Sequence, residues 1–160
     1  MWEASYPFFE WNNASWLGQA ISDSIWYFPA IETVHILAMC IMFGALLVLN
    51  LRLLGLGMTK QPLPLLAQTL MPFVNWGLVL MLISGYAMFT SEALKDFSND
   101  GFKFKMACLA GILVWQYTVY GWLLKQDDAK RSRALGGLAA IVNFALWFGV
   151  GAGGRAIGFV

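Results

Sequence analysis

The chain has 160 residues, of which 59% are hydrophobic and 12% are charged, and its mean hydropathy is +0.64. A soluble protein would carry about 25% charged residues, so an ordinary soluble globular fold is excluded. The formal net charge of +1 leaves no basic excess to attract nucleic acid. Cys40 and Cys108 both lie in apolar runs, where cysteines behave as small hydrophobes, so a disulfide framework is excluded. Composition therefore indicates an integral membrane protein whose main partner is the lipid bilayer.

The first 24 residues differ from the rest because aromatic and polar side chains are mixed there. Such a mixture favours the headgroup layer over the membrane interior, so we expect residues 1–24 to form an interfacial amphipathic segment. The first charges are Glu3 and Glu10, whereas a cleavable signal peptide begins with a basic region. We therefore expect this segment to be retained.

Four apolar stretches follow, each long enough to cross a hydrocarbon core of about 30 Å, which requires about 20 helical residues. We place these spans at about 26–54, 65–90, 104–124 and 135–153. The predicted fold is an all-α, integral membrane four-helix bundle, and residues 1–160 are expected to form a single transmembrane domain.

The predicted connections are short. Gly55 and Gly57 are expected to end the first span, and residues 91–101 to form the longest external connection. Pro72 lies inside the second span, where it predicts a kink unless neighbours satisfy the freed carbonyl.

The orientation follows from the basic residues, because cytoplasmic loops are enriched in Lys and Arg. Six of the ten fall after the first or the third span: Arg52, Lys60, Lys125, Lys130, Arg131 and Arg133. We therefore expect both termini outside the cytoplasm, on the periplasmic side of a bacterial inner membrane.

Ionisable side chains inside a span are costly and are therefore candidate functional groups. His35 is the only histidine of the chain, and Glu32 lies about one turn before it on the same helix face. Lys105 lies near the external start of the third span and Arg155 just beyond the external end of the fourth. We expect these four residues to lie at one depth.

One imidazole with a net positive surround suits a cofactor that carries carboxylates. We therefore predict a membrane-embedded redox subunit that holds haem b or a quinone near the external face, with His35 as the metal ligand or hydrogen-bonding group. Glu32 is expected to orient the imidazole, while Lys105 and Arg155 bind anionic groups of the cofactor. Electron transfer then needs a membrane or periplasmic redox partner. A haem iron would be five-coordinate, or completed by Met, water or a second protomer. No catalytic residue is predicted, and whether the protein is an enzyme stays open.

Other functions fit parts of the same pattern. His35, Met39 and Met42 form a stripe with the softness that Cu(I) prefers, so a copper or small-solute permease is one alternative. Glu32 and His35 also match the Glu-x-x-His motif of di-iron bundles, although the remaining carboxylates would have to come from a homo-oligomer. A third alternative is a non-catalytic scaffold that forms homo-oligomers through its glycine-rich fourth span.

Structural roles are also available for these polar residues. His35 would then hydrogen-bond Glu32 or a backbone carbonyl, while Lys105 and Arg155 would extend to lipid headgroups. The midspan amides are expected to form interhelical hydrogen bonds: Asn75, Gln116 and Asn143.

Four motifs carry a resemblance to a known family: Phe28-Pro29-Ala30-Ile31-Glu32-Thr33-Val34-His35, Asn50-Leu51-Arg52-Leu53-Leu54-Gly55, Phe102-Lys103-Phe104-Lys105, and Gly154-Arg155-Ala156-Ile157-Gly158-Phe159. Over nearly its whole length the chain resembles a family of small bacterial four-helix membrane proteins of no settled role, related in outline to the copper-resistance D type. The resemblance implies that all four candidate site residues belong to shared motifs. Two positions depart from it. The family more often has Asp at position 50, and relatives often have a second His within 115–120. Ligation by two histidines of one chain is therefore not expected.

Overall fold

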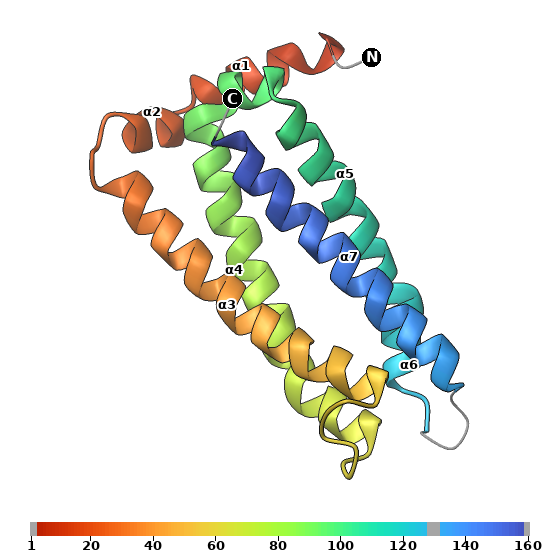
Figure 1. Cartoon of the computed structure of the whole chain (residues 1–160). Coiled ribbons are helices and arrows are strands. Elements are labelled where there is room, and N and C mark those ends of the chain that lie inside the picture. Colours follow the sequence, from red (N-terminus) through yellow and green to blue (C-terminus); the bar gives the residue numbers. More distant parts are fainter. Residues whose placement is uncertain (1–2, 128–131, 159–160) are drawn as a thin grey trace.

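The computed structural model describes residues 3–127 and 132–158, and all the regular structure in these ranges is helical (Figure 1). Three short elements come first: η1 (Glu3–Ser5), α1 (Tyr6–Asn13) and α2 (Trp16–Ser22). The long elements follow: α3 (Tyr27–Leu54), α4 (Leu63–Ser98), α5 (Asp100–Trp115) with its continuations η2 (Gln116–Tyr120) and α6 (Gly121–Leu124), and α7 (Arg133–Ile157). Four stretches are long and apolar enough to cross a membrane: Tyr27–Leu54, Leu63–Ser98, Asp100–Leu124 and Arg133–Ile157. The predicted all-α fold with four candidate membrane spans is confirmed.

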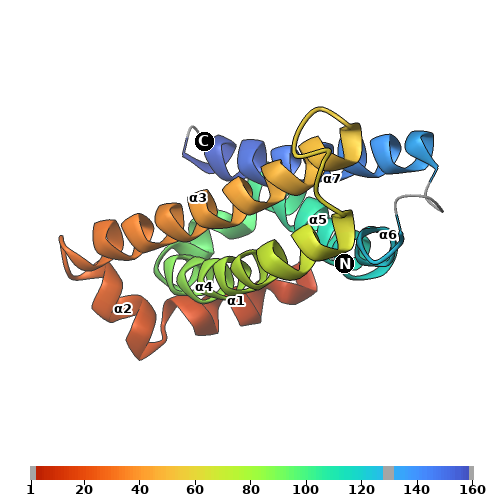
Figure 2. The ribbon, with the colours of Figure 1, turned by 90° about the horizontal axis from the view of Figure 1, so that it is seen from below.

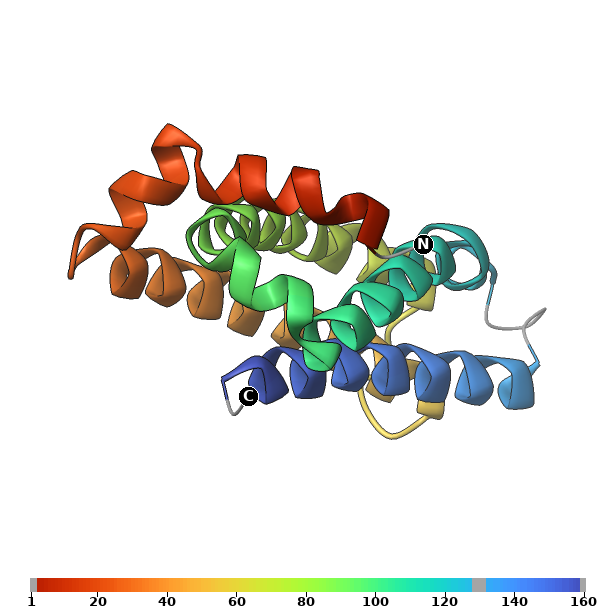
Figure 3. The same ribbon diagram turned by 90° about the horizontal axis from the view of Figure 1, so that it is seen from above.

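The long helices form a bundle in which α3 packs along α4, α5 packs along α7, and α3 also contacts α7. The first and last described residues lie at one end of this bundle, here named the terminal end (Figure 1). The connection from α3 to α4 and helix α6 lie at the other end, named the loop end (Figure 2). At the terminal end, α1 and α2 lie over the end of α4, as the view from above shows (Figure 3).

The helices end where the sequence supplies suitable capping residues. Gly55 follows α3 with a φ of 76°, and its N–H donates to the carbonyl of Arg52, 3.1 Å away. Such a left-handed residue after a helix is usually glycine because a Cβ would be strained there. At the start of α5, the side chain of Asn99 accepts from the N–H of Gly101 at 2.8 Å and of Phe102 at 3.3 Å. Asn99 therefore caps α5 and limits the turn after α4 to a single residue.

The second span is longer than the sequence predicted. Residues 91–98, expected as part of an external connection, continue α4 as helix as far as Ser98. Packing against α1 explains this difference, because the Phe9 ring lies 5.3 Å from the rings of both Phe89 and Phe97, and Ala93 between them is fully buried. Backbone angles inside α4 leave the helical region at Glu92 (φ −124°, ψ 19°) and not at Pro72, where the kink was expected.

Glycines set the closest approaches between helices. A Cβ placed on Gly77 of α4 would lie 2.8 Å from the Cβ of Met42 on α3. A Cβ on Gly153 of α7 would lie 2.9 Å from the Cβ of Lys105 and 3.0 Å from the carbonyl oxygen of Gly101, both on α5. The glycine-rich fourth span thus makes a close approach to α5 of its own chain, as small residues allow in membrane bundles.

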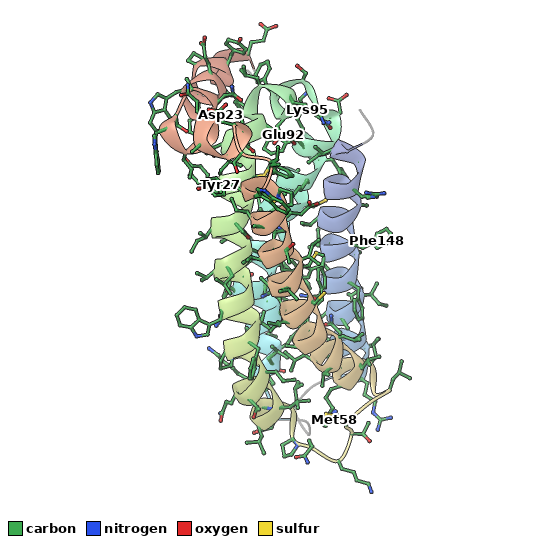
Figure 4. The ribbon with its side chains drawn as sticks, turned by 90° about the vertical axis from the view of Figure 1, so that its left-hand side faces the viewer. Asp23, Tyr27, Met58, Glu92, Lys95 and Phe148 are labelled. Carbon is green, nitrogen blue, oxygen red and sulfur yellow. The ribbon has the colours of Figure 1, made fainter. Side chains whose placement is uncertain are left out.

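Large apolar side chains cover the outside of the bundle. Trp76 is 70% exposed and Phe148 is 77% exposed, and Figure 4 shows Phe148 projecting outward from α7. Figure 4 also places Asp23 and Lys95 at the terminal end and Met58 at the loop end. An apolar exterior between two polar ends is the pattern expected of a protein that is embedded in a lipid bilayer.

Candidate functional site

His35 lies in the terminal half of α3, and its ring points across to α4. The Nδ1 atom lies 2.8 Å from the hydroxyl oxygen of Ser84. That hydroxyl is also 2.6 Å from the carbonyl oxygen of Leu80, to which it donates its single proton. Since the Ser84 oxygen must then accept from the imidazole, we infer that Nδ1 carries the ring proton. In a neutral ring this leaves the lone pair on Nε2. The ring also makes a hydrogen-bonding contact with the backbone of Met81 on α4.

The ring of His35 rests against the backbone of α4 at Gly85. A Cβ on Gly85 would lie 3.2 Å from Cε1 and 3.7 Å from Nδ1 of the ring. The first distance is shorter than ordinary van der Waals contact, so even an alanine would press on the imidazole. Gly85 and Ser84 together therefore determine where the imidazole lies.

Lys105 approaches the same region from α5. A Cβ placed on Gly154 would lie 3.8 Å from each of Cδ, Cε and Nζ of Lys105, so the Lys105 side chain extends along the surface of α7. Its ammonium group is close enough to interact electrostatically with both His35 and Asp96. The structure thus brings together the predicted residues His35 and Lys105, which come from different spans.

Asp96 is a third member of this region, and the sequence interpretation missed it. The residue is 6% exposed, and its Oδ1 atom has no hydrogen-bond partner among the described residues. By sequence it belongs to the external connection expected over residues 91–101, whereas the extension of α4 buries it. The spacing of Phe89, Ala93 and Phe97, four residues apart, was the available signal for a continuing amphipathic helix.

Glu32 and Arg155, the other two predicted site residues, are both exposed. Glu32 is close enough to influence His35 electrostatically, yet the atom that accepts from Nδ1 belongs to Ser84. The acceptor that orients the ring is thus Ser84 on α4, while Glu32 lies on the exposed surface of α3, and a role for Glu32 at the site stays a prediction. Arg155 follows Gly154 on the exposed face of α7.

The methionines of the alternative copper stripe belong to the core. Met42 is fully buried against Gly77, and Met39 packs against the same apolar cluster. Within the ranges that the structure describes, no three His, Cys, Asp or Glu side chains converge as a metal site would require. Two apolar surface grooves, one between α2 and α3 and one beside Cys40 and Phe73, do not include His35.

A separate buried polar layer lies toward the loop end. Asn50 donates to Asn143 at 3.0 Å and accepts from the hydroxyl of Tyr120 at 2.8 Å, while Trp147 donates to Gln116 at 3.1 Å. We name these five residues the amide layer. The interhelical hydrogen bonds expected for Gln116 and Asn143 are confirmed. The third amide, Asn75, accepts from the Tyr117 hydroxyl at 2.9 Å on the exposed surface.

Four candidate spans, an apolar exterior and a histidine held between two of the helices define a polytopic helical membrane protein. Within that class the chain belongs to the DUF6644 family, a family of unknown function, which it matches over residues 8–160. Comparison with curated proteins and with solved structures finds no match to this chain. The expected relation to the copper-resistance D type stays a prediction.

Proposed function

We propose that this protein is a membrane-embedded redox or cofactor-binding subunit that holds haem b or a quinone through Nε2 of His35. The observation that carries this proposal is the hydrogen bond between Nδ1 and Ser84, which puts the ring proton on Nδ1 and the lone pair of a neutral ring on Nε2. Histidines that bind metals usually donate their other ring N–H to a neighbouring acceptor in this way. A neutral Nε2 serves equally as an axial ligand to haem iron or as an acceptor for a quinol hydroxyl.

Lys105 supplies the complementary positive charge. Haem propionates are anionic and a quinone carbonyl oxygen carries partial negative charge, and a half-buried ammonium group stabilises such charge more strongly than an exposed one. Asp96 offers an acceptor oxygen close to the same ammonium group. Arg155, on the exposed side of α7, is proposed to contact a second anionic group of the cofactor.

The packing around His35 bears on which of the two cofactors fits a single chain. The His35 ring rests against Gly85 and lines neither surface groove. A quinone head group that enters from the lipid therefore needs a smaller rearrangement of the helices than a haem macrocycle would need. A haem macrocycle would lie beside α3 or between two protomers. The donor atoms suit both cofactors, and the geometry of the single chain favours the quinone.

We further propose that the terminal end faces the periplasm of a bacterial inner membrane. By sequence position, six of the ten Lys and Arg residues belong to the loop end, and seven of the nine Asp and Glu residues belong to the terminal end. Cytoplasmic loops are enriched in basic residues, which supports a cytoplasmic loop end.

The test is to purify the full chain from its native membrane and analyse what it retains. We expect a Soret band with reducible visible bands, or a co-purifying quinone that is identified by mass spectrometry. His35→Ala should abolish retention, and Ser84→Ala should weaken it by about 10- to 100-fold, the usual effect of losing the partner of a ligating histidine. A wild-type protein that carries neither cofactor would refute the proposal, and bound copper would support the permease instead.

Lys105 has a matched control two residues away. Lys103 forms an ion pair with Asp100, with 2.7 Å between Nζ and Oδ1, on the surface of α5. Lys105→Ala should therefore lower cofactor retention while Lys103→Ala leaves it unchanged. Equal losses from both variants would show that Lys105 acts only through the charge of the terminal end.

A further inference from the structure

The amide layer contains two buried donors that no described residue satisfies. Gln116 and Asn143 are 1% and 0% exposed, and each uses its side-chain oxygen as an acceptor. Their nitrogens, Nε2 and Nδ2, have no hydrogen-bond partner among the described residues. Buried donors are rarely left unsatisfied, and an ordered water commonly serves where protein atoms do not.

The two donors border one part of the bundle. Gln116 accepts from Trp147, and Asn143 lies four residues before Trp147 on the same face of α7. On the facing helix, Tyr120 lies four residues after Gln116 and joins the layer through Asn50. The bond between Trp147 and Gln116 thus forms one level between α5–η2 and α7, and the bonds of Asn50 with Tyr120 and Asn143 form the next. Each level contains one unsatisfied amide nitrogen.

The backbone is also unusual at this place. Gln116 and Tyr120 are the first and last residues of η2, which is a π-helical turn. Such a turn accommodates one extra residue in a helix and is frequently found at functional sites. The irregular turn therefore coincides with the unsatisfied donors, which are independent observations that point to the same location.

We infer that the amide layer binds an internal water molecule that bridges Nε2 of Gln116 and Nδ2 of Asn143. The two lone pairs of a water accept from these amides, and its hydrogens donate to the remaining lone pairs of the amide and phenol oxygens. An anion would also accept from both amides. However, it would have to lose its hydration among five neutral side chains, which costs more than neutral donors return.

Radiolytic hydroxyl labelling tests this inference, because X-rays generate radicals from bound water inside a protein. The full chain in lipid nanodiscs would be irradiated and its oxidised residues mapped by mass spectrometry. Trp147 and Tyr120, which are 1% and 0% exposed, should be labelled in the wild type despite their burial. Trp16, which is 83% exposed, reports labelling by bulk water in the same sample.

Variants connect the labelling to the two donors. The double variant Gln116→Leu with Asn143→Leu should lose most labelling of Trp147 and Tyr120 but keep that of Trp16. Gln116→Met, which changes the side-chain shape less, should lower it in a protein whose circular dichroism is unchanged. Asn75→Leu is the matched control, because Asn75 accepts from Tyr117 outside the layer. This variant should label as the wild type does.

Two results would overturn the assignment. The first is a wild type in which Trp147 and Tyr120 are unlabelled, or are labelled as strongly in Gln116→Met as in the wild type. The second is labelling that rises when chloride in the buffer is replaced by gluconate, because this would place an anion in the layer. Neither readout depends on His35 or on a bound cofactor, so the proposed function can fail while this site stands.

Discussion

Substituting Gly153 and Gly151 by alanine should change stability in opposite directions. A Cβ at Gly153 would meet the Cβ and N of Lys105 and the carbonyl oxygen of Gly101 at 2.9–3.0 Å, and none of these atoms can rotate away. Carbon contacts are optimal at about 3.5–4.0 Å, so α5 and α7 must separate by several tenths of an ångström. Such overpacking costs about 1–3 kcal/mol, against about 1 kcal/mol gained in helix propensity. At Gly151 nothing lies within 4 Å, so the propensity gain alone applies.

The free energies of unfolding of the two variants should therefore differ by about 1–3 kcal/mol, with Gly153→Ala the less stable. Titration with sodium dodecyl sulfate, followed by circular dichroism, measures this difference. Gly149→Ala should fall between them, because the nearest atom is Sγ of Cys108 at 2.7 Å, which can change rotamer. Reaction of Cys108 with a maleimide should be faster in Gly153→Ala if the helices separate. Equal stability of Gly151→Ala and Gly153→Ala would refute the close approach of α5 and α7.

Three further outcomes are expected. Tyr120→Phe should destabilise the bundle by about 1 kcal/mol in the same titration, because it removes the donor to a buried amide, whereas Tyr117→Phe on the exposed surface should cost less. Gly18→Ala should detach α2 from α4 and speed proteolysis near residue 24, because its Cβ would lie 2.5 Å from the carbonyl oxygen of Thr90, while Gly44→Ala has open space and should not. Reporters fused to either terminus should both be periplasmic, and a cytoplasmic signal from either would reverse the proposed orientation.

The four spans were predictable because membrane burial requires long apolar runs, and hydropathy records them directly. The end of α4 was not predicted, since Glu92, Lys95 and Asp96 resemble a solvated connection when considered by composition alone. The helical state of residues 93–98, beyond the break at Glu92, depends on contacts with Phe9, about 80 residues earlier in the chain. Local sequence does not report such long-range packing.

The candidate site was predicted only in part, for a related reason. His35 and Lys105 stand out because a charged or titratable group inside a span is rare. Ser84 is small, and serine is common in membrane helices, so nothing in the sequence marked it as the partner of His35. The partner became apparent only when the register between α3 and α4 was known. Conversely, depth alone placed Glu32 and Arg155 with His35, although depth does not determine which way a side chain points.

The tight crossing of α3 and α4 at Gly77 has a consequence for the movement of protons across the membrane. Between His35 and Asn50 the buried positions of α3 are all hydrocarbon or thioether: Ala38, Met42, Ala45, Leu46 and Leu49. This stretch spans about 20 Å of helix, at 1.5 Å per residue, and α3 itself supplies no buried side chain in it along which a proton could hop. Under the proposed function, chemistry at His35 would exchange protons with the compartment at the terminal end, while this apolar zone of α3 helps to withstand the transmembrane voltage. Met42→Asn, placed in the middle of that zone, is the substitution that should make liposomes containing the protein leak protons.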